Sequence, residues 1–165
     1  MGNAYSEIAI QANKYEKVQT LMHYVNKGNL LMEHWLQKPG KATGIDGINK
    51  EKYEESLEEN LENLLRRMKK FQYRPKAARR TYIPKAGSDK MRPLGIPSYE
   101  DKLVQGIMSR ILNEIYEGRF YEFSYGFREK RSCHQALKKV NEILITKKVN
   151  YVVDADIKGF FDNVN

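Results

Sequence analysis

Apolar and acidic residues alternate in Tyr151-Val152-Val153-Asp154-Ala155-Asp156-Ile157-Lys158-Gly159-Phe160-Phe161-Asp162. The alternation predicts a strand that carries Val152, Asp154 and Asp156 on one face and Tyr151, Val153, Ala155 and Ile157 on the other. A short strand that ends in carboxylates is typical of a divalent-metal site on a rigid scaffold. Taken alone, the stretch fits equally well an ordinary strand whose terminal aspartates cap a turn.

The composition indicates a nucleic-acid partner. A net charge of +8 and an isoelectric point of about 9.4 favour a polyanion. No apolar run reaches the roughly twenty residues that span a bilayer, and the N-terminus has no signal-peptide pattern. The single cysteine, Cys133, excludes an internal disulfide and favours a reducing compartment. We therefore expect a cytoplasmic protein with no membrane partner.

Apolar spacing of three and four residues predicts four helical regions, over 5–37, 50–71, 98–118 and 132–145. The first is expected to break in two at Asn26–Asn29, where polar residues and a glycine cluster. The second begins after a predicted cap at Asn49. Its acids come first and its bases last, an order that complements the helix macrodipole. We expect this helix to be scaffold, with a basic end that adds to the segment after it.

Two further helices carry the pattern of a capping box at their start. Ser98 is followed three residues later by Asp101, and Ser132 by Gln135. The last helix is expected to bury Ala136, Leu137, Val140, Ile143 and Leu144.

The segment 76–92 changes composition sharply. It holds a single acid, Asp89, against Lys76, Arg79, Arg80, Lys85, Lys90 and Arg92. Residues 81–84 and 92–97 predict a hairpin joined through 86–89, with its prolines at strand edges or ends. Such a ribbon would be a cationic flap for phosphate groups, with Arg79 and Arg80 as nucleic-acid contacts. A plain solvated basic face is the alternative.

Aromatic residues and cations interleave after the third helix. Phe120, Tyr121, Phe123, Tyr125 and Phe127 lie among Arg119, Arg128, Lys130 and Arg131. This mixture suits base stacking and backbone contact in a nucleic-acid complex, and core packing explains about half of such rings equally well.

Together the segments resemble the N-terminal part of a group II intron-encoded reverse transcriptase, or maturase. The motifs that carry the resemblance are Thr43-Gly44-Ile45-Asp46-Gly47, Tyr82-Ile83-Pro84-Lys85-Ala86-Gly87, Arg92-Pro93-Leu94-Gly95-Ile96-Pro97, Ser124-Tyr125-Gly126-Phe127-Arg128, Arg131-Ser132-Cys133-His134-Gln135-Ala136-Leu137 and Asp156-Ile157-Lys158-Gly159-Phe160-Phe161-Asp162. Each motif is weak by itself, and their shared order makes the match specific.

The resemblance implies a metal and nucleotide site. Asp156 would be the first catalytic aspartate of a two-Mg²⁺ centre, with the backbone carbonyl of Ile157 nearby. Lys85 and Arg92 would hold the triphosphate of the incoming deoxynucleotide. Phe161 would be the aromatic gate that excludes a 2′-hydroxyl.

It also implies contacts with the RNA template, the intron RNA and the DNA primer. Thr43 and Gly44 would help to seat the template. Template and primer backbone would meet the stretch from Arg128 to Leu137, in particular Arg128, Lys130, Arg131 and His134.

The expected fold is α+β: the mostly helical fingers of a right-hand polymerase with a β-hairpin, plus the first palm strand. We expect a helical extension and the start of the fingers over 1–75, fingers over 76–150 and a palm strand over 151–165. The Tyr/Phe-Ala-Asp-Asp motif of the family does not occur in the chain, so we expect this polypeptide alone not to polymerise DNA.

Three alternatives remain open. The chain could be a non-catalytic RNA-binding module. It could be a self-associating unit that dimerises through the fingers or the palm edge. It could also be a reverse transcriptase of the retron, diversity-generating or defence type, rather than of the intron type in a bacterial cytoplasm.

Overall fold

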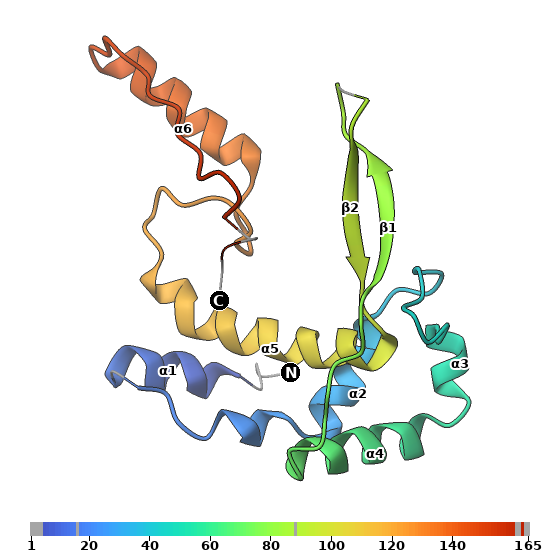
Figure 1. Cartoon of the computed structure of the whole chain (residues 1–165). Coiled ribbons are helices and arrows are strands. Elements are labelled where there is room, and N and C mark those ends of the chain that lie inside the picture. The colour runs from blue at the N-terminus through green and yellow to red at the C-terminus, as the bar shows by residue number, and fades with distance from the viewer. Residues whose placement is uncertain (1–4, 16, 88, 161–162, 164–165) are drawn as a thin grey trace. The chain divides into compact units, whose positions relative to one another are not determined.

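The computed structural model describes residues 5–15, 17–87, 89–160 and 163 (Figure 1). The chain divides into two compact units, Met1–Arg119 and Phe120–Asn165. Helices and one antiparallel hairpin confirm the α+β class. The predicted subdomain boundaries at 75 and 150 stay predictions. In the part of the chain that the structure describes, no helix is both long and apolar enough to cross a membrane.

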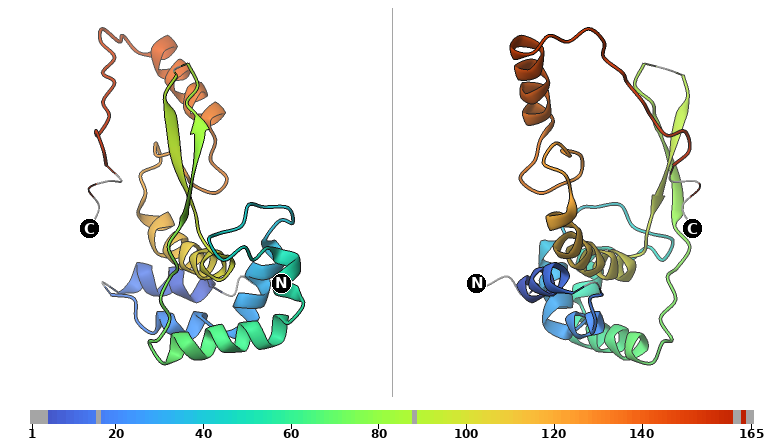
Figure 2. Two further views of the ribbon diagram at one scale, coloured as in Figure 1. Left: turned by 45° about the vertical axis from the view of Figure 1, so that its right-hand side comes forward. Right: turned by 90° about the vertical axis from the view of Figure 1, so that its left-hand side faces the viewer.

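The first unit is a helical body with a projecting hairpin (Figures 1 and 2). Its elements, in chain order, are α1 (Ser6–Lys14), η1 (Leu21–Tyr24), α2 (Lys27–Leu36), α3 (Lys50–Glu54), α4 (Leu57–Lys69), β1 (Arg79–Pro84), β2 (Met91–Ile96), α5 (Tyr99–Tyr116) and η2 (Glu117–Arg119). The second unit contains α6 (Cys133–Thr146).

Helix α5 supplies the centre of the core. Its residues Leu103, Ile107 and Ile111 recur every four positions and are each at most 2% exposed, because this spacing places them on one face. They belong to one cluster of buried apolar residues with Tyr5, Ile8, Tyr24, Val25, Leu30, Tyr53, Leu61, Leu64 and Tyr99.

Buried polar groups link the helices of this body. Glu33 of α2 pairs with Arg110 of α5. His34 is fully buried, with Nε2 3.0 Å from a Glu54 carboxylate oxygen and Nδ1 2.9 Å from the Tyr99 hydroxyl. A neutral ring that donates from Nε2 and accepts at Nδ1 satisfies both partners. No local sequence pattern indicates this network, because the partners of His34 lie 20 and 65 residues away.

Two predicted helices are interrupted at positions that carry no clear sequence signal. The chain leaves α1 at Tyr15, and Thr20 has a left-handed backbone, so the region 5–37 breaks before Asn26–Asn29. A second break falls at Asn26, as predicted, where the Asn26 side chain caps α2 by accepting from the Asn29 N–H. The region 50–71 splits into α3 and α4, because the Asn60 side chain donates to the Tyr53 carbonyl in place of a helical N–H.

The expected strand over 151–157 is wrong for this structure. These residues are in neither a strand nor a helix, and no strand occurs among the described residues of the second unit. A strand needs a partner for its backbone groups, and the described residues of the second unit offer none. The inward stripe predicted for α6 is wrong as well, because Leu137, Val140 and Leu144 are all about half exposed or more.

The buried tyrosines predict a loss of stability at alkaline pH. Burial, followed by the charges of Glu54 and Glu51, raises the pKa of Tyr99 to about 12. Burial likewise raises the pKa of Tyr53 and of Tyr73. Above pH 10 the folded state keeps protons on these tyrosines that the unfolded chain has released. Their contribution to the free energy of unfolding is therefore fully present below pH 10 and is lost between about pH 10 and 12. Tyr99 alone accounts for up to about 2.7 kcal/mol.

The measurement is the free energy of unfolding against pH, together with tyrosinate absorbance. We expect a late-titrating class among the 11 tyrosines, which Tyr99→Phe reduces by one. Titration of every tyrosine near pH 10 in the folded protein would contradict this prediction.

Candidate nucleic-acid interface

The hairpin sorts its cations onto one face. Strands β1 and β2 pair antiparallel, with Arg79 opposite Ile96 and Ile83 opposite Arg92. The Lys85 N–H donates to the Lys90 carbonyl at 2.9 Å and continues the same register. Because facing residues share a side of the ribbon and sides alternate along a strand, Arg79, Lys85, Lys90 and Arg92 lie on one face. We call these four residues the cationic face.

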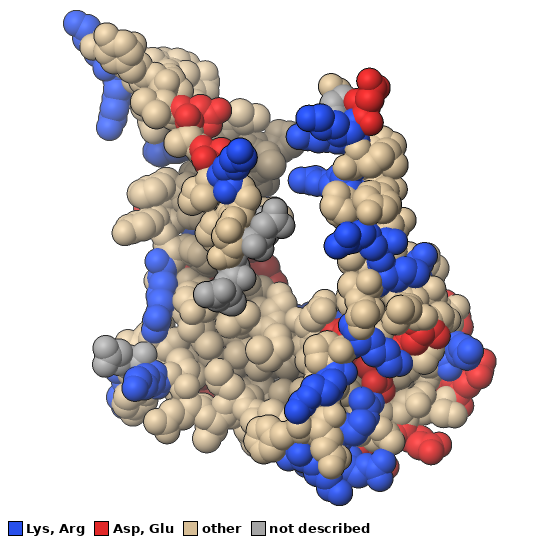
Figure 3. Space-filling model, in the orientation of Figure 1, with Lys and Arg blue, Asp and Glu red and all other residues tan. Residues whose placement is uncertain are grey.

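The opposite face is different in character. It carries Arg80 as its one cation among the described strand residues, together with Tyr82, Pro84, Met91, Pro93 and Gly95. Strand residues of the hairpin are exposed, apart from the half-buried Thr81 and Ile96. The side chains of Lys and Arg gather along the hairpin from its base toward its tip (Figure 3). The predicted hairpin is therefore confirmed, and its charge is one-sided.

A buried carboxylate fixes the segment that leads into the hairpin. Asp101 is 3% exposed and accepts from the Ser98 hydroxyl at 2.6 Å and from the Lys76 N–H at 3.1 Å. It also accepts from the Tyr73 hydroxyl. The predicted capping box at Ser98 is not formed, because Ser98 bonds to the carboxylate and not to backbone N–H groups. Asp101 therefore ties the start of α5 to residues 73–76.

Three cations hold the loop 42–48 beside the hairpin base. Arg79 Nε donates to the Thr43 carbonyl at 2.9 Å, and Lys102 Nζ donates to the Ala42 carbonyl at 2.6 Å. Lys76 Nζ pairs with Asp46 at 3.1 Å. Burial lowers the pKa of Lys102, and this effect prevails over the opposing charge of Asp46. The loop is thus attached to β1, to α5 and to the segment that precedes β1.

Gly44 lies where this loop meets the chain before α5. A Cβ atom there would come within 2.6 Å of Ser98 Cα and 2.7 Å of the Pro97 oxygen. Glycine is required at this position, because a residue with a Cβ atom could not approach the backbone of residues 97–98 so closely. The structure therefore brings Thr43, Gly44 and Arg79 together, with Lys85 and Arg92 further along the same ribbon.

In the second unit, aromatic rings and cations contact one another. The Arg128 guanidinium donates to the carbonyls of Tyr121 and Ser124, both at 2.9 Å, and lies 5.0 Å from the centre of the Phe120 ring. Arg131 lies 5.6 Å from the centre of the Tyr125 ring. Arg128 thus organises its own loop, and its nucleic-acid contact stays a prediction.

The other predicted contacts of this unit lie near the start of α6. Lys130 and His134 are exposed, and Lys130 has a left-handed backbone with φ 59°. The Ser132–Gln135 capping box is confirmed, since each side chain bonds to the backbone N–H of the other residue. Tyr121 and Phe123 stack with ring centres 5.1 Å apart and stay more than 70% exposed, which leaves flat apolar surface at the solvent.

The predicted metal residues do not form a metal site in the described structure. Asp156 and Ile157 are exposed on an irregular segment. No group of three or more histidine, cysteine, aspartate or glutamate side chains that could hold a metal occurs among the described residues. One carboxylate does not complete a two-ion centre. Phe161 lies outside the described residues.

Lys90 was counted among the cations of the predicted flap without a predicted nucleic-acid contact, and Lys102 was missed. Lys90 faces Lys85 once the hairpin register is known, so the turn at 86–89 contained a usable signal. Lys102 contacts Ala42, 60 residues away, and no local pattern indicates that contact.

Comparison with known proteins agrees with these motifs. The family model described as "Reverse transcriptase (RNA-dependent DNA polymerase)" matches residues 83–165. The chain is 41% identical over 125 residues to the Group II intron-encoded protein LtrA of Lactococcus lactis subsp. cremoris, covering 76% of this chain and 20% of that protein. It is 35% identical over 156 residues to Protein YkfC of Escherichia coli (strain K12), covering 90% of this chain and 41% of that protein.

A fungal protein is similar over nearly the whole chain. It is the "Uncharacterized 91 kDa protein in cob intron" of Schizosaccharomyces pombe, 29% identical over 160 residues, which cover 97% of this chain and 19% of that protein. The chain therefore spans about a fifth to two fifths of the length of these three relatives.

Proposed function

We propose that this chain, which belongs to the reverse transcriptase (RNA-dependent DNA polymerase) family, binds RNA template, DNA primer and incoming deoxynucleotide for RNA-directed DNA synthesis. The cationic face carries this proposal. It presents four positive side chains on one side of an exposed ribbon, at a spacing that suits a chain of phosphates. We assign the hairpin and the helices around it to the fingers of a right-hand polymerase.

Each predicted residue has a place in this proposal. Lys85 and Arg92 contact the triphosphate, Arg as a bidentate donor and Lys as a point charge. Thr43 and Gly44 seat the template beside Arg79, while Arg80 contacts nucleic acid from the other face. Backbone phosphates are contacted by Arg128, Lys130, Arg131 and His134.

The remaining roles concern the chemistry of the family. We propose that Phe161 excludes a 2′-hydroxyl. Asp156, with the Ile157 carbonyl, would be a ligand of Mg²⁺, a metal that supplies charge stabilisation to nucleotidyl transfer. The described residues do not complete that centre.

Binding of intron RNA, with assistance to splicing, is the second part of the proposal. It is supported by similarity to a group II intron-encoded protein and to an intron protein of a yeast. The same relatives do not favour a purely non-catalytic module or a retron, diversity-generating or defence enzyme. Self-association through the fingers or residues 151–157, and a bacterial cytoplasmic location, stay predictions.

Loss of the cationic face is expected to weaken RNA binding and its salt dependence. Without a deoxynucleotide bound, Lys85 and Arg92 face the RNA backbone with the rest of the cationic face, so Lys85→Ala with Arg92→Ala should remove two RNA phosphate contacts. The slope of log affinity against log salt then falls by about 1.4, at roughly 0.7 per contact for a single strand. We expect the affinity at moderate salt to fall by about tenfold or more. The measurement is anisotropy of labelled single-stranded RNA titrated with the chain across a salt series.

The control removes the same charge elsewhere in the first unit. Lys17 and Lys38 are exposed and have no ion pair among the described residues. Lys17→Ala with Lys38→Ala should change the slope by less than half as much. An equal change in both double variants would mean that the hairpin contributes to binding only as part of the net charge, and would overturn the proposal.

A further inference from the structure

An exposed phenylalanine follows the C-terminus of α4. Phe71 is 83% exposed and has a φ of 56°, in the left-handed region. Its N–H donates to the Met68 carbonyl at 3.0 Å, and the Gln72 N–H donates to the Arg67 carbonyl at 2.8 Å. These two bonds form a Schellman motif with Phe71 at the position that glycine usually occupies. We call residues 66–74 the α4 tip.

The conformation of Phe71 is not explained by packing. A left-handed backbone is unfavourable for a residue with a Cβ, and burial of the ring would be the ordinary compensation. Here the ring is left in solvent, so neither the backbone nor the core favours phenylalanine at this position. An outlier of this kind indicates a role outside the fold itself.

The α4 tip holds the ring on a rigid support. The Arg74 guanidinium donates to the carbonyls of Phe71 and Tyr73, at 3.0 and 2.9 Å. The Tyr73 hydroxyl bonds to the buried Asp101, and Arg67 Nη2 donates to both carboxylate oxygens of Glu100, at 2.6 and 2.7 Å. Two side chains therefore anchor the α4 tip to α5, and a backbone that is already held in place loses little entropy when the ring binds a partner.

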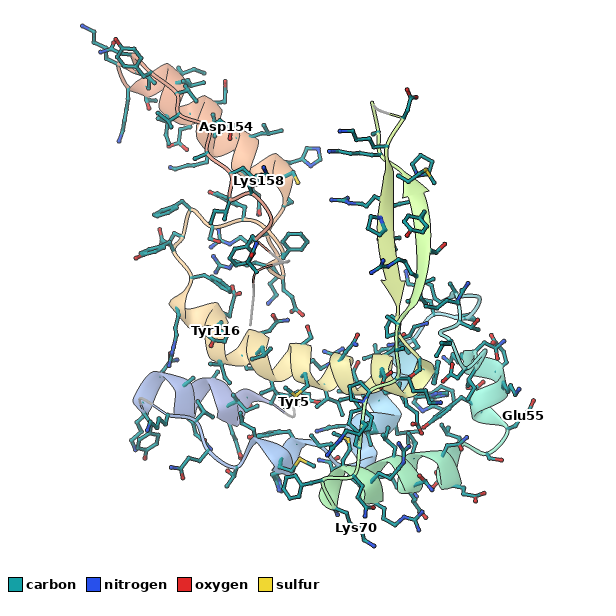
Figure 4. The ribbon with its side chains drawn as sticks, in the orientation of Figure 1. Tyr5, Glu55, Lys70, Tyr116, Asp154 and Lys158 are labelled. Atoms are coloured by element: carbon teal, nitrogen blue, oxygen red, sulfur yellow. The ribbon has the colours of Figure 1, made fainter. Side chains whose placement is uncertain are left out.

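The surroundings of the ring are strongly cationic. No acid occurs in the sequence between Glu62 and Asp89. Arg66, Lys69 and Lys70 are exposed and have no ion pair among the residues that the structure describes. Lys70, at the end of α4, points outward from the helix (Figure 4). Cations here complement the helix dipole, but that effect does not account for the aromatic ring among them.

We propose that the α4 tip is a second binding site, for single-stranded RNA. The Phe71 ring stacks on an unpaired base, and Arg66, Lys69 and Lys70 contact the flanking phosphates. A flat exposed ring between cations matches a base between phosphates, whereas an acidic peptide needs only the cations. In Figures 1 and 2 the end of α4 and the hairpin tip lie at opposite ends of the first unit. The site is thus separate from the cationic face.

The test separates stacking from charge with two labelled probes. One is a single-stranded RNA, and the other is an abasic strand of the same length and phosphate number. Phe71→Gly should lower the affinity for the RNA roughly tenfold and leave the affinity for the abasic strand unchanged. Lys69→Ala with Lys70→Ala should weaken binding of both probes.

Folding provides an internal control. Glycine is suited to the left-handed position, so Phe71→Gly should raise the midpoint of denaturant unfolding while it weakens RNA binding. Loss of affinity therefore cannot come from unfolding. An equal loss for both probes, or no loss for either, would overturn the proposal. If Phe71→Gly weakened binding to polyglutamate but not to RNA, this result would also overturn the proposal and would assign the site to an acidic protein segment.

The outcome does not depend on the role of the cationic face. When one RNA strand spans both sites, the fold-losses from Phe71→Gly and from the Lys85/Arg92 double variant should multiply in the combined variant, because the sites share no residue. If the hairpin variant has no effect, the proposed function fails while the Phe71 result still stands.

Discussion

Asp101→Ala is expected to lower the free energy of unfolding of the first unit by about 3–5 kcal/mol. Hydrogen bonds to a charged group contribute about 1.5–3 kcal/mol each, and Asp101 accepts three. Alanine also leaves the Ser98 hydroxyl, in a residue that is 1% exposed, without its acceptor. Residues 73–76 then lose their attachment to α5. Since these residues precede β1, we expect the base of the hairpin to become mobile.

Denaturant unfolding with amide hydrogen exchange at residues 73–80 measures both effects. Asp101→Asn retains the shape and part of the acceptor capacity, so its loss should be smaller, about 1–2 kcal/mol. The control is Glu59→Ala, which removes an exposed carboxylate of α4 and should change stability by no more than about 0.5 kcal/mol. Similar losses for Asp101→Ala and Glu59→Ala would show that the buried network contributes little.

Elements that depend only on residues close together in the chain could be predicted from the sequence. The hairpin follows from its turn residues and from two apolar runs, and its turn includes Gly87 with φ 74°. Asn49 caps α3 by accepting from the Lys52 N–H at 2.9 Å, as expected. The Ser132 capping box formed for the same reason, because a cap needs only residues within one turn.

Features that depend on contacts between distant segments could not be predicted from the sequence. The Ser98–Asp101 pair has the spacing of a capping box, yet Tyr73 and Lys76 bring Asp101 into a different network. The strand expected over 151–157 has the right alternation, but a strand forms only with a partner. The same argument applies to the candidate site. Register places Lys85 and Arg92 on one face, whereas the bond from Arg79 to Thr43 spans 36 residues.

Gly44→Ala is expected to lower the free energy of unfolding by about 3–4 kcal/mol and to detach the loop 42–48 from the hairpin base. The added methyl group would meet backbone atoms of Pro97 and Ser98 at 2.6–2.7 Å. Backbone cannot rotate away as a side chain can, so the loop itself must move, at the upper end of the effects seen for overpacking. Its bonds to Arg79, Lys76 and Lys102 would then lengthen or break.

Gly47→Ala is the matched control for this change. Gly47 lies in the same loop with φ 65°, and a Cβ there meets nothing within 4 Å. Alanine at Gly47 therefore adds only backbone strain, about 1 kcal/mol. The measurement is denaturant unfolding of both variants, with hydrogen exchange over residues 42–48. Because Thr43 and Gly44 are the proposed template seat, Gly44→Ala should also reduce RNA affinity more than Gly47→Ala does. Equal effects of the two variants on stability would mean that the contact between Gly44 and Ser98 does not hold the loop in place.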